Sequence, residues 1–178
     1  MAVQARYFDL TIVGQGDPDD DLFFGDREMP DRLILTSGRP VLIIPFIGTK
    51  DAIGKNVLVA WDAGQQASRA VHNALPILQE ADKVTVLVVN PKGGVDGTGD
   101  LPGADIAEHL SRHGVNAEAD HVKTDIDPGD MLLSRAADKS IDLLVMGTYG
   151  HARWTEMILG GITKHMLKNM TLPVLTSH

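Results

Sequence analysis

Glycines recur with a defined spacing in MGTYGHARWTEMILGG (Met146–Gly161), where they occupy positions 147, 150, 160 and 161. They follow an apolar run typical of a strand and lead into a run typical of a helix. Glycine lets backbone N–H groups approach an anion closely, and the start of a helix adds partial positive charge. The spacing G-x2-G-x9-G at such a junction predicts a phosphate-binding loop. The alternative interpretation is a tight turn between strand and helix without a ligand.

Other residues with suitable chemistry are less specific. Asp62 closes an apolar run and is either a ligand contact or the N-cap of the next helix. His109 and His113 stand four apart, a spacing that can bind zinc, but the sequence offers neither an H-E-x-x-H arrangement nor an obvious third ligand, which favours a solvated helix face. His151 and Arg153 either approach phosphates or simply open a helix. We therefore predict neither a metal site nor a catalytic constellation.

Composition narrows the class of protein. The chain has 178 residues, 43% of them hydrophobic, and a formal net charge of −8, which argues against nucleic acid and an anionic membrane surface as partners. It contains no cysteine, which excludes disulfides and thiol chemistry. The longest apolar runs fall far short of the ~18 residues of a membrane helix, and the N-terminus lacks the layout of a signal peptide. We expect a cytoplasmic protein.

Strands and helices must alternate to position the glycine segment. The apolar patterns predict strands at Asn56–Trp61, Val84–Val89, Val115–Val122, Ile141–Met146 and Pro173–Thr176, and helices at Gln65–Ala81, Ala104–His113, Met131–Asp138 and Trp154–Lys168. Pro76 should bend the first helix or cost it a backbone bond. This alternation predicts an α/β fold with an open, five-stranded, parallel, doubly wound sheet. Ligands of such sheets bind at the carboxyl ends of the strands, where the strand order reverses.

The chain also repeats itself. FDLTIVGQ (Phe8–Gln15) resembles IDLLVMGT (Ile141–Thr148), and RPVLIIP (Arg39–Pro45) resembles LPVLTSH (Leu172–His178). The paired glycines (147 − 14 = 133) and the paired prolines (173 − 40 = 133) have the same offset, which indicates duplication. We therefore predict a complete unit at residues 55–178 and, at residues 1–50, the C-terminal fragment of a degenerate first unit. The chain is then expected to be the C-terminal part of a tandem protein.

The degenerate unit is not expected to bind ATP. Asp17 replaces its second glycine, and the acidic run Asp17, Asp19, Asp20 and Asp21 would repel a triphosphate. A divalent cation is an alternative ligand for this run, but a solvated loop is the better interpretation.

The glycine segment, the PVL near the end and VAWD (Val59–Asp62) together resemble the universal stress proteins (UspA-like family). In that family the pattern G-x2-G-x9-G-[ST] binds ATP; here Gly161 stands where Ser or Thr is expected, and the Ser often found shortly after the first-strand Asp is also missing. The resemblance implies a Rossmann-like sheet of the adenine nucleotide alpha hydrolase type. It places Asp62 at the ribose, the backbone of Val89 and the side chain of Met146 at adenine, and the following residues around ribose and phosphates: Gly147, Gly150, Gly160, Gly161, Ile162 and Thr163.

The resemblance implies an ATP-binding module in stress response, with Mg²⁺ present only with the nucleotide and at most slow hydrolysis. Dimers of this family pair through the last strand, so we expect a homodimer, or a pseudo-dimer within the chain that a partner completes. The alternative function is an interaction or dimerisation protein of the same fold that binds no nucleotide. A third interpretation, an electron-transfer flavoprotein-like subunit, would call for a flavin and a larger partner interface, which the sequence does not show.

Overall fold

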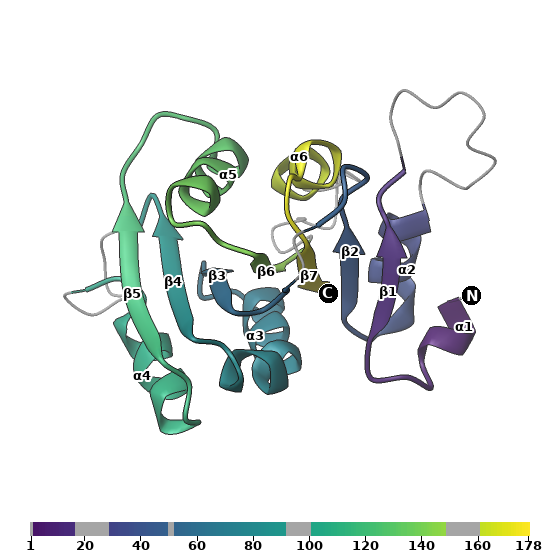
Figure 1. Ribbon diagram of the computed structural model, residues 1–178, viewed down its shortest axis with the longest axis horizontal. Helices are drawn as coiled ribbons and strands as arrows, with labels where there is room; N and C mark the ends of the chain where they lie inside the picture. Colours follow the sequence, from purple (N-terminus) through teal and green to yellow (C-terminus); the bar gives the residue numbers. More distant parts are fainter. Residues whose placement is uncertain (1, 17–28, 50–51, 92–100, 149–160) are drawn as a thin grey trace.

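The computed structural model describes residues 2–16, 29–49, 52–91, 101–148 and 161–178. Its seven strands form one sheet in the order β1-β2-β7-β6-β3-β4-β5 (Figure 1). The strands are β1 (Thr11–Gly14), β2 (Val41–Ile44), β3 (Asn56–Ala60), β4 (Lys83–Val89), β5 (Ala117–Val122), β6 (Leu143–Gly147) and β7 (Val174–Ser177). The helices are α1 (Ala2–Ala5), α2 (Met29–Ser37), α3 (Gln65–Gln79), α4 (Ala104–Arg112), α5 (Pro128–Asp138) and α6 (Gly161–Asn169).

The predicted doubly wound architecture is confirmed for the part of the chain that begins with β3. Strands β3 to β7 are mutually parallel in the order β5-β4-β3-β6-β7, and four helices connect them. Helices α3 and α4 pack on one face of the sheet, through residues such as Leu78 and Leu110. Helices α5 and α6 pack on the other, through residues such as Leu132 and Met166. The sheet is larger than the predicted five strands because β1 and β2 extend it.

The burial of each element explains its sequence. The central strands β3 and β6 have buried apolar residues on both faces, as expected for strands covered by helices on each side. Helix α3 buries Ala67, Ala70, Val71, Ala74 and Leu78 at helical spacing, and it continues through Pro76 to Gln79. Proline inside this helix therefore removes one N–H donor without ending the helix.

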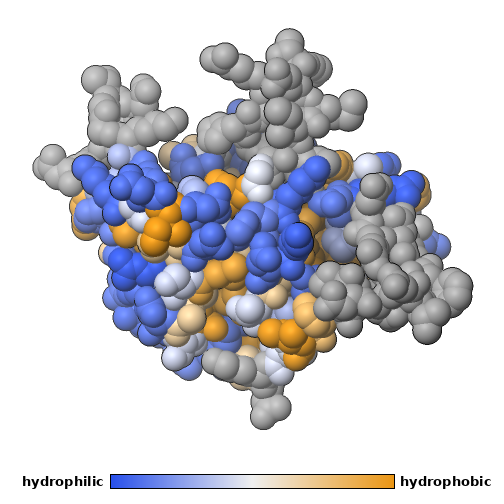
Figure 2. Space-filling view, turned by 90° about the horizontal axis from the view of Figure 1, so that it is seen from above, coloured by the Kyte–Doolittle hydropathy of each residue, from blue (hydrophilic) through white to orange (hydrophobic). Residues whose placement is uncertain are grey.

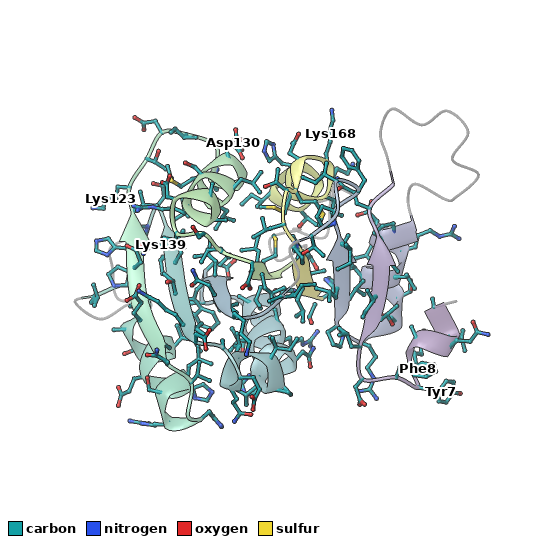
Figure 3. The ribbon with its side chains drawn as sticks, in the orientation of Figure 1. Tyr7, Phe8, Lys123, Asp130, Lys139 and Lys168 are labelled. Atoms are coloured by element: carbon teal, nitrogen blue, oxygen red, sulfur yellow. The ribbon has the colours of Figure 1, made fainter. Side chains whose placement is uncertain are left out.

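Strand β5 is an edge strand and is correspondingly polar. The Glu118 carboxylate lies 2.9 Å from Lys83 Nζ and 3.7 Å from Lys139 Nζ, and it accepts a hydrogen bond from Thr85 Oγ1 at 3.2 Å. Figure 3 shows Lys139 beside this strand. The hydrogen bond from Lys83 is the main reason that the pKa of Glu118 is lowered, and slight desolvation opposes it. The charges tie β5 to β4 and to the end of α5.

Asp142, the acidic residue that enters β6, has a structural role. Its carboxylate accepts hydrogen bonds from the backbone N–H groups of Gly54 (2.7 Å), Lys55 (3.1 Å) and Asn56 (3.0 Å). These bonds hold the start of β3 against the start of β6. The acidic residue in IDLLVMGT therefore anchors the sheet at its amino edge and lies at the end of the strands opposite the glycine segment.

The first 50 residues add β1, β2 and α2 with the same pairing that β6 and β7 have. Thr11 pairs with Val41 and Gly14 pairs with Ile44 in the parallel β1–β2 ladder. The residues 133 positions later in the sequence pair in the same way, as Leu144 with Val174 and Gly147 with Ser177. The spacing found in the sequence thus recurs as an identical strand register.

The last strands of the two segments pair within the chain. Strand β2 runs antiparallel to β7, and Leu42 lies opposite Leu175, the residue 133 positions after it. Strand β7 is therefore paired on both edges, by β2 and by β6. This corrects the expectation of a homodimer through the last strand, because β7 has no free edge for a second copy. The last strands pair inside the chain, as expected for the alternative of a pseudo-dimer.

Hydrogen bonds of the Gln15 side chain link the segment of β1 and β2 to α6. Gln15 Nε2 donates to the carbonyl oxygens of Leu167 (2.8 Å) and Lys168 (3.2 Å), in the last turn of α6. Gln15 Oε1 accepts from the Phe46 N–H at 3.2 Å. One amide thus satisfies carbonyls at a helix end and fixes the chain after β2.

The outer strand β1 is covered on one face only. Its Ile12 is 62% exposed, whereas Val145, at the same position of the repeat in β6, is 0% exposed. Helix α3 packs over β6, and among the described residues no helix takes the corresponding place over β1. The two positions therefore carry similar side chains in opposite environments.

Candidate functional site

A cavity of about 310 Å³ opens at the carboxyl edge of the sheet. The lining residues lie at the carboxyl ends of β3, β4 and β6, just after β3, or in the first two turns of α3, α5 and α6. They are Ala60, Trp61, Asp62, Gln66, Ala67, Leu87, Val89, Pro128, Leu132, Met146, Gly147, Gly161, Ile162 and Thr163. Figure 2 views the molecule from this edge and shows hydrophobic residues interspersed with hydrophilic ones. A smaller cavity, of about 210 Å³, lies at the amino ends of β6 and β7.

The larger cavity lies where the strand order reverses. From β3 the chain proceeds to β4 and β5 on one side, and β6 and β7 lie on the other side of β3. The loops that leave the carboxyl ends of β3 and β6 therefore diverge and leave a crevice between them. The fold thus places the cavity at the site expected for ligands of such sheets.

The structure brings most of the predicted site residues together at this cavity. Seven of them line it: Asp62, Val89, Met146, Gly147, Gly161, Ile162 and Thr163. Gly150, Gly160, His151 and Arg153 lie outside the described residues, as does the acidic run from Asp17 to Asp21. The roles of all these residues toward a nucleotide stay predictions.

Several lining residues were not predicted from the sequence. Trp61 and Gln66 flank Asp62 closely in the chain, so the same loop signal would have found them. Pro128 and Leu132 open α5, which follows β5, and a rule that takes every helix start at the carboxyl edge would have found these two residues. Leu87 is a buried strand residue, and no feature of the sequence distinguishes it from the rest of β4.

Gly147 and Gly161 differ in the space that their surroundings leave for a side chain. A Cβ atom added at Gly147 would lie 2.4 Å from the backbone nitrogen of Ala67 and 2.5 Å from the carbonyl carbon of Gln66. Gly147 therefore lets the first turn of α3 lie directly against the end of β6. A Cβ atom at Gly161 would meet no heavy atom of the described residues within 4 Å, so these residues leave space for a side chain there.

Asp62 shapes the turn that leads into α3. Its Oδ1 accepts the N–H of Gly64 at 2.8 Å, and Ala63 between them has a φ of 60°. Gly64, not Asp62, is the N-cap residue of α3, and no side chain among the described residues caps the helix there. The expected alternative role of Asp62 as the N-cap is thus wrong by two residues, because the helix begins at Gln65. Its exposed carboxylate lies at the cavity.

The starts of α5 and α6 are connected beside the cavity. Asp127 caps α5 by accepting the N–H groups of Gly129 (2.8 Å) and Asp130 (3.4 Å). The carboxylate of Asp130 lies 2.7 Å from His165 Nε2 on α6, and Figure 3 shows Asp130 on the side of α5 that faces α6. One ligand atom from each of Asp127, Asp130 and His165 lies within 4.8 Å of the others, so the three can hold a metal ion. Hydrogen bonds within the group account for the arrangement without a metal.

A sequence model described as the universal stress protein family matches residues 54–178. The chain belongs to this family. Universal stress protein Slr1230 of Synechocystis sp. is 44% identical over 39 residues, which are 22% of this chain and 14% of that protein. Universal stress protein MJ0577 of Methanocaldococcus jannaschii is 31% identical over 48 residues, which are 27% of this chain and 30% of that protein.

Solved structures of the family share the fold. A universal stress protein from Archaeoglobus fulgidus superposes with a TM-score of 0.75 at 18% identity over 99% of this chain, which spans 64% of the length of that protein. A universal stress protein solved in complex with cAMP superposes with a TM-score of 0.51 at 20% identity, over 70% of this chain and 97% of that one. Within the described residues, no helix is both long and apolar enough to cross a membrane.

Proposed function

We propose that the cavity at the carboxyl edge binds an adenine nucleotide such as ATP, and that the protein is a nucleotide-binding module in stress response. The observation that carries the proposal is the convergence of seven predicted residues, from four separate segments, at one cavity where the strand order reverses. The family supports the proposal, and so does the related structure solved with cAMP.

The chemistry of the lining suits the two ends of a nucleotide. Leu87, Val89, Met146 and Leu132 present apolar side chains from β4, β6 and α5, suitable for the flat faces of a base. The first turn of α3 lines the cavity with Gln66 and Ala67 and contributes partial positive charge there, because the first N–H groups of a helix have no carbonyl partner within it. The Asp62 carboxylate can accept hydrogen bonds from ribose hydroxyl groups.

Gly161 sets the strength of phosphate binding in this proposal. A serine hydroxyl at this position would add one donor to a phosphate oxygen, worth about 1 kcal/mol and up to ~3 kcal/mol toward a charged oxygen. The described residues around Gly161 leave room for such a side chain. Gly161→Ser should therefore tighten ATP binding by about 5-fold to 150-fold.

We propose binding with little or no turnover. Asp62 is the one carboxylate in the described lining of the cavity. Asp127 and Asp130 lie beside the cavity, where Asp127 caps α5 and Asp130 pairs with His165, so we do not assign them to a metal ion or to a base at the nucleotide. Mg²⁺ would then enter with the nucleotide, coordinated by its phosphates. Any hydrolysis would be slow.

The first experiment releases bound nucleotide from the purified protein by denaturation and resolves it on a column. The emptied protein is then titrated calorimetrically with ATP and Mg²⁺, with AMP and with cAMP. Nucleotide near stoichiometry, or heat that gives a Kd below 1 mM as an approximate threshold, supports the proposal. No nucleotide and no heat at millimolar concentrations of all three would refute it and favour an interaction protein of the same fold.

A matched pair of variants tests the site itself. In Asp62→Asn the amide oxygen can still accept the Gly64 N–H, so the turn is kept and the charge is lost. We expect a loss of affinity of about 10-fold, from one hydrogen bond to a charged group. Asp138→Asn, at the far end of α5, is the control and should bind as the unaltered protein does.

We also propose that residues 1–50 derive from the C-terminal part of a second, degenerate unit of the same family. The shared strand register and the 133-residue offset support this origin. The pairing of β2 with β7 would then be an internal version of pairing between two units.

A further inference from the structure

We propose that His72, His109 and His113 form a binding site for a divalent transition metal ion such as Zn²⁺, outside the nucleotide cavity. The sequence presented His109 and His113 without a third ligand. The fold supplies one, since His72 on α3 lies beside His109 on α4. The three residues come from two helices that pack on the same face of the sheet.

Two of the three ring pairs are about as close as imidazoles around one metal ion. The ring centroids of His109 and His113 are 4.7 Å apart, and those of His72 and His109 are 5.5 Å apart. Zinc–nitrogen bonds of about 2.1 Å and tetrahedral angles place two ligating rings with their centroids roughly 5 Å apart. The rings are tilted by 44° and 58°. The ligand nitrogens of all three do not lie within 4.8 Å of one another as the side chains stand, so the rings of His109 and His113 must rotate about their broad χ2 torsions to bring them together.

The hydrogen bonding of His72 leaves the correct nitrogen for a metal. His72 Nδ1 lies 3.1 Å from the carbonyl oxygen of Ser68, and a carbonyl only accepts, so Nδ1 carries the proton. The lone pair of the neutral ring is then on Nε2. Ligating histidines almost always donate their other N–H to a carbonyl, carboxylate or water in this way, which fixes the tautomer and orients the ring.

The two helices that carry the ligands are packed together in the core. Leu78 of α3 and Leu110 of α4 are both fully buried in the same apolar cluster. Gln79 Nε2, at the end of α3, donates to the carbonyl oxygen of His113 at 2.9 Å. Metal binding therefore requires rotation of side chains only, and the backbone stays in place. The free-energy cost of forming the site is small for this reason.

The ligand set defines the class of metal. Three neutral imidazoles and a water complete a four-coordinate site for Zn²⁺, Ni²⁺ or Cu²⁺. Mg²⁺ and Ca²⁺ prefer oxygen ligands, and this set has none from the protein. His72 and His113 are exposed and His109 is half-buried, so an ion reaches the site directly from solvent.

The test titrates the full chain, without an affinity tag and stripped with a chelator, with ZnCl₂ in a calorimeter. We expect one site per chain, and at least a 10-fold loss of affinity in His72→Ala and in His109→Ala, since each removes one of three ligands. His121→Ala, an exposed histidine on β5, is the matched control and should bind Zn²⁺ unchanged. MgCl₂ should give no heat at this site. The variants remove exposed or half-exposed side chains, and circular dichroism checks that each one folds.

A second variant separates the site from the other metal-ligating group. His165→Ala disrupts the Asp127, Asp130 and His165 group and should leave Zn²⁺ affinity unchanged. Loss of the site in His165→Ala would overturn the proposal, and so would unchanged affinity in His72→Ala. No heat at millimolar ZnCl₂ would also overturn it and would mean that the rings are stacked without a ligand. Shifts of the ring protons of all three histidines in NMR spectra on adding one equivalent of Zn²⁺ would support it.

Discussion

Substitution of Gly147 distinguishes a role in packing from a role in ligand binding, because only the packing role predicts a loss of stability without nucleotide. Gly147→Ala adds a Cβ atom 2.4 Å from Ala67 N and 2.5 Å from Gln66 C, where ordinary contacts are 3.4 to 4 Å. The start of α3 would have to move away from β6 by about 1 Å, and the clashing atoms belong to the backbone, so no side-chain rotation relieves the overlap. Overpacking of this kind costs about 1–3 kcal/mol, and we expect the upper end of that range.

The consequence is measurable as a change of melting temperature. For a chain of this length 1 kcal/mol corresponds to about 2–4 °C, so Gly147→Ala should melt about 6–12 °C lower. Gly161→Ala is the control, because the added methyl meets no heavy atom within 4 Å in the part of the chain that the structure describes, and alanine favours a helix by up to ~1 kcal/mol. Its melting temperature should be unchanged or higher. The assay is thermal unfolding followed by circular dichroism, with no nucleotide added.

Two results would refute this reasoning. A Gly147→Ala protein that melts within about 2 °C of the unaltered one would mean that α3 does not lie against β6 as closely as described. Equal destabilisation by Gly147→Ala and Gly161→Ala would mean that the two glycines are equally closely packed. A loss of ATP affinity in Gly147→Ala at full stability would assign the glycine to the phosphates and not to packing.

Three further predictions follow from burial and charge. Val145→Ala should lower the free energy of unfolding by about 2–3 kcal/mol and Ile12→Ala by less than ~1 kcal/mol, because the first side chain is fully buried and the second mostly exposed. Urea titrations of both variants measure these losses. Equal losses would contradict the environments described for β1 and β6. Glu118→Gln should destabilise by less than about 1 kcal/mol at neutral pH, since the pair with Lys83 is half-exposed. Because the folded pKa of Glu118 is lowered, its contribution to stability is present above the unfolded pKa and is lost as the pH falls through the folded pKa. The stabilities of the unaltered protein and of Glu118→Gln should therefore converge in acid. A difference that stays constant with pH would rule out the ion pair as the cause. Thr176→Val should stabilise by about 1 kcal/mol, because the buried Thr176 hydroxyl has no partner among the described residues; a lower melting temperature would reveal a partner for it.

Sequence patterns were sufficient for the five strands and the first three helices of residues 55–178, and for the location of the cavity. The first part of the predicted helix Trp154–Lys168 lies outside the described residues. Strands buried on both faces, such as β3 and β6, alternate with amphipathic helices, and that alternation is enough to predict a parallel, doubly wound sheet. In such a sheet the loops after the strands share one edge, so Asp62, Val89 and Gly147 could be grouped from their positions in the chain. The 133-residue offset likewise appears in the sequence because duplicated strands keep their residues in order.

Contacts across elements depended on the tertiary structure. The clash that makes Gly147 necessary involves Ala67, eighty residues earlier in the chain, and no local pattern records how closely a helix lies against a strand. The meeting of His72 with His109 depends on the rotation of two helices about their axes on one face of the sheet. The pairing of β7 with β2 on one edge and β6 on the other depends on how the two segments of the chain pack together. Periodicity determines which face of an element is apolar, and only packing decides which other element that face meets.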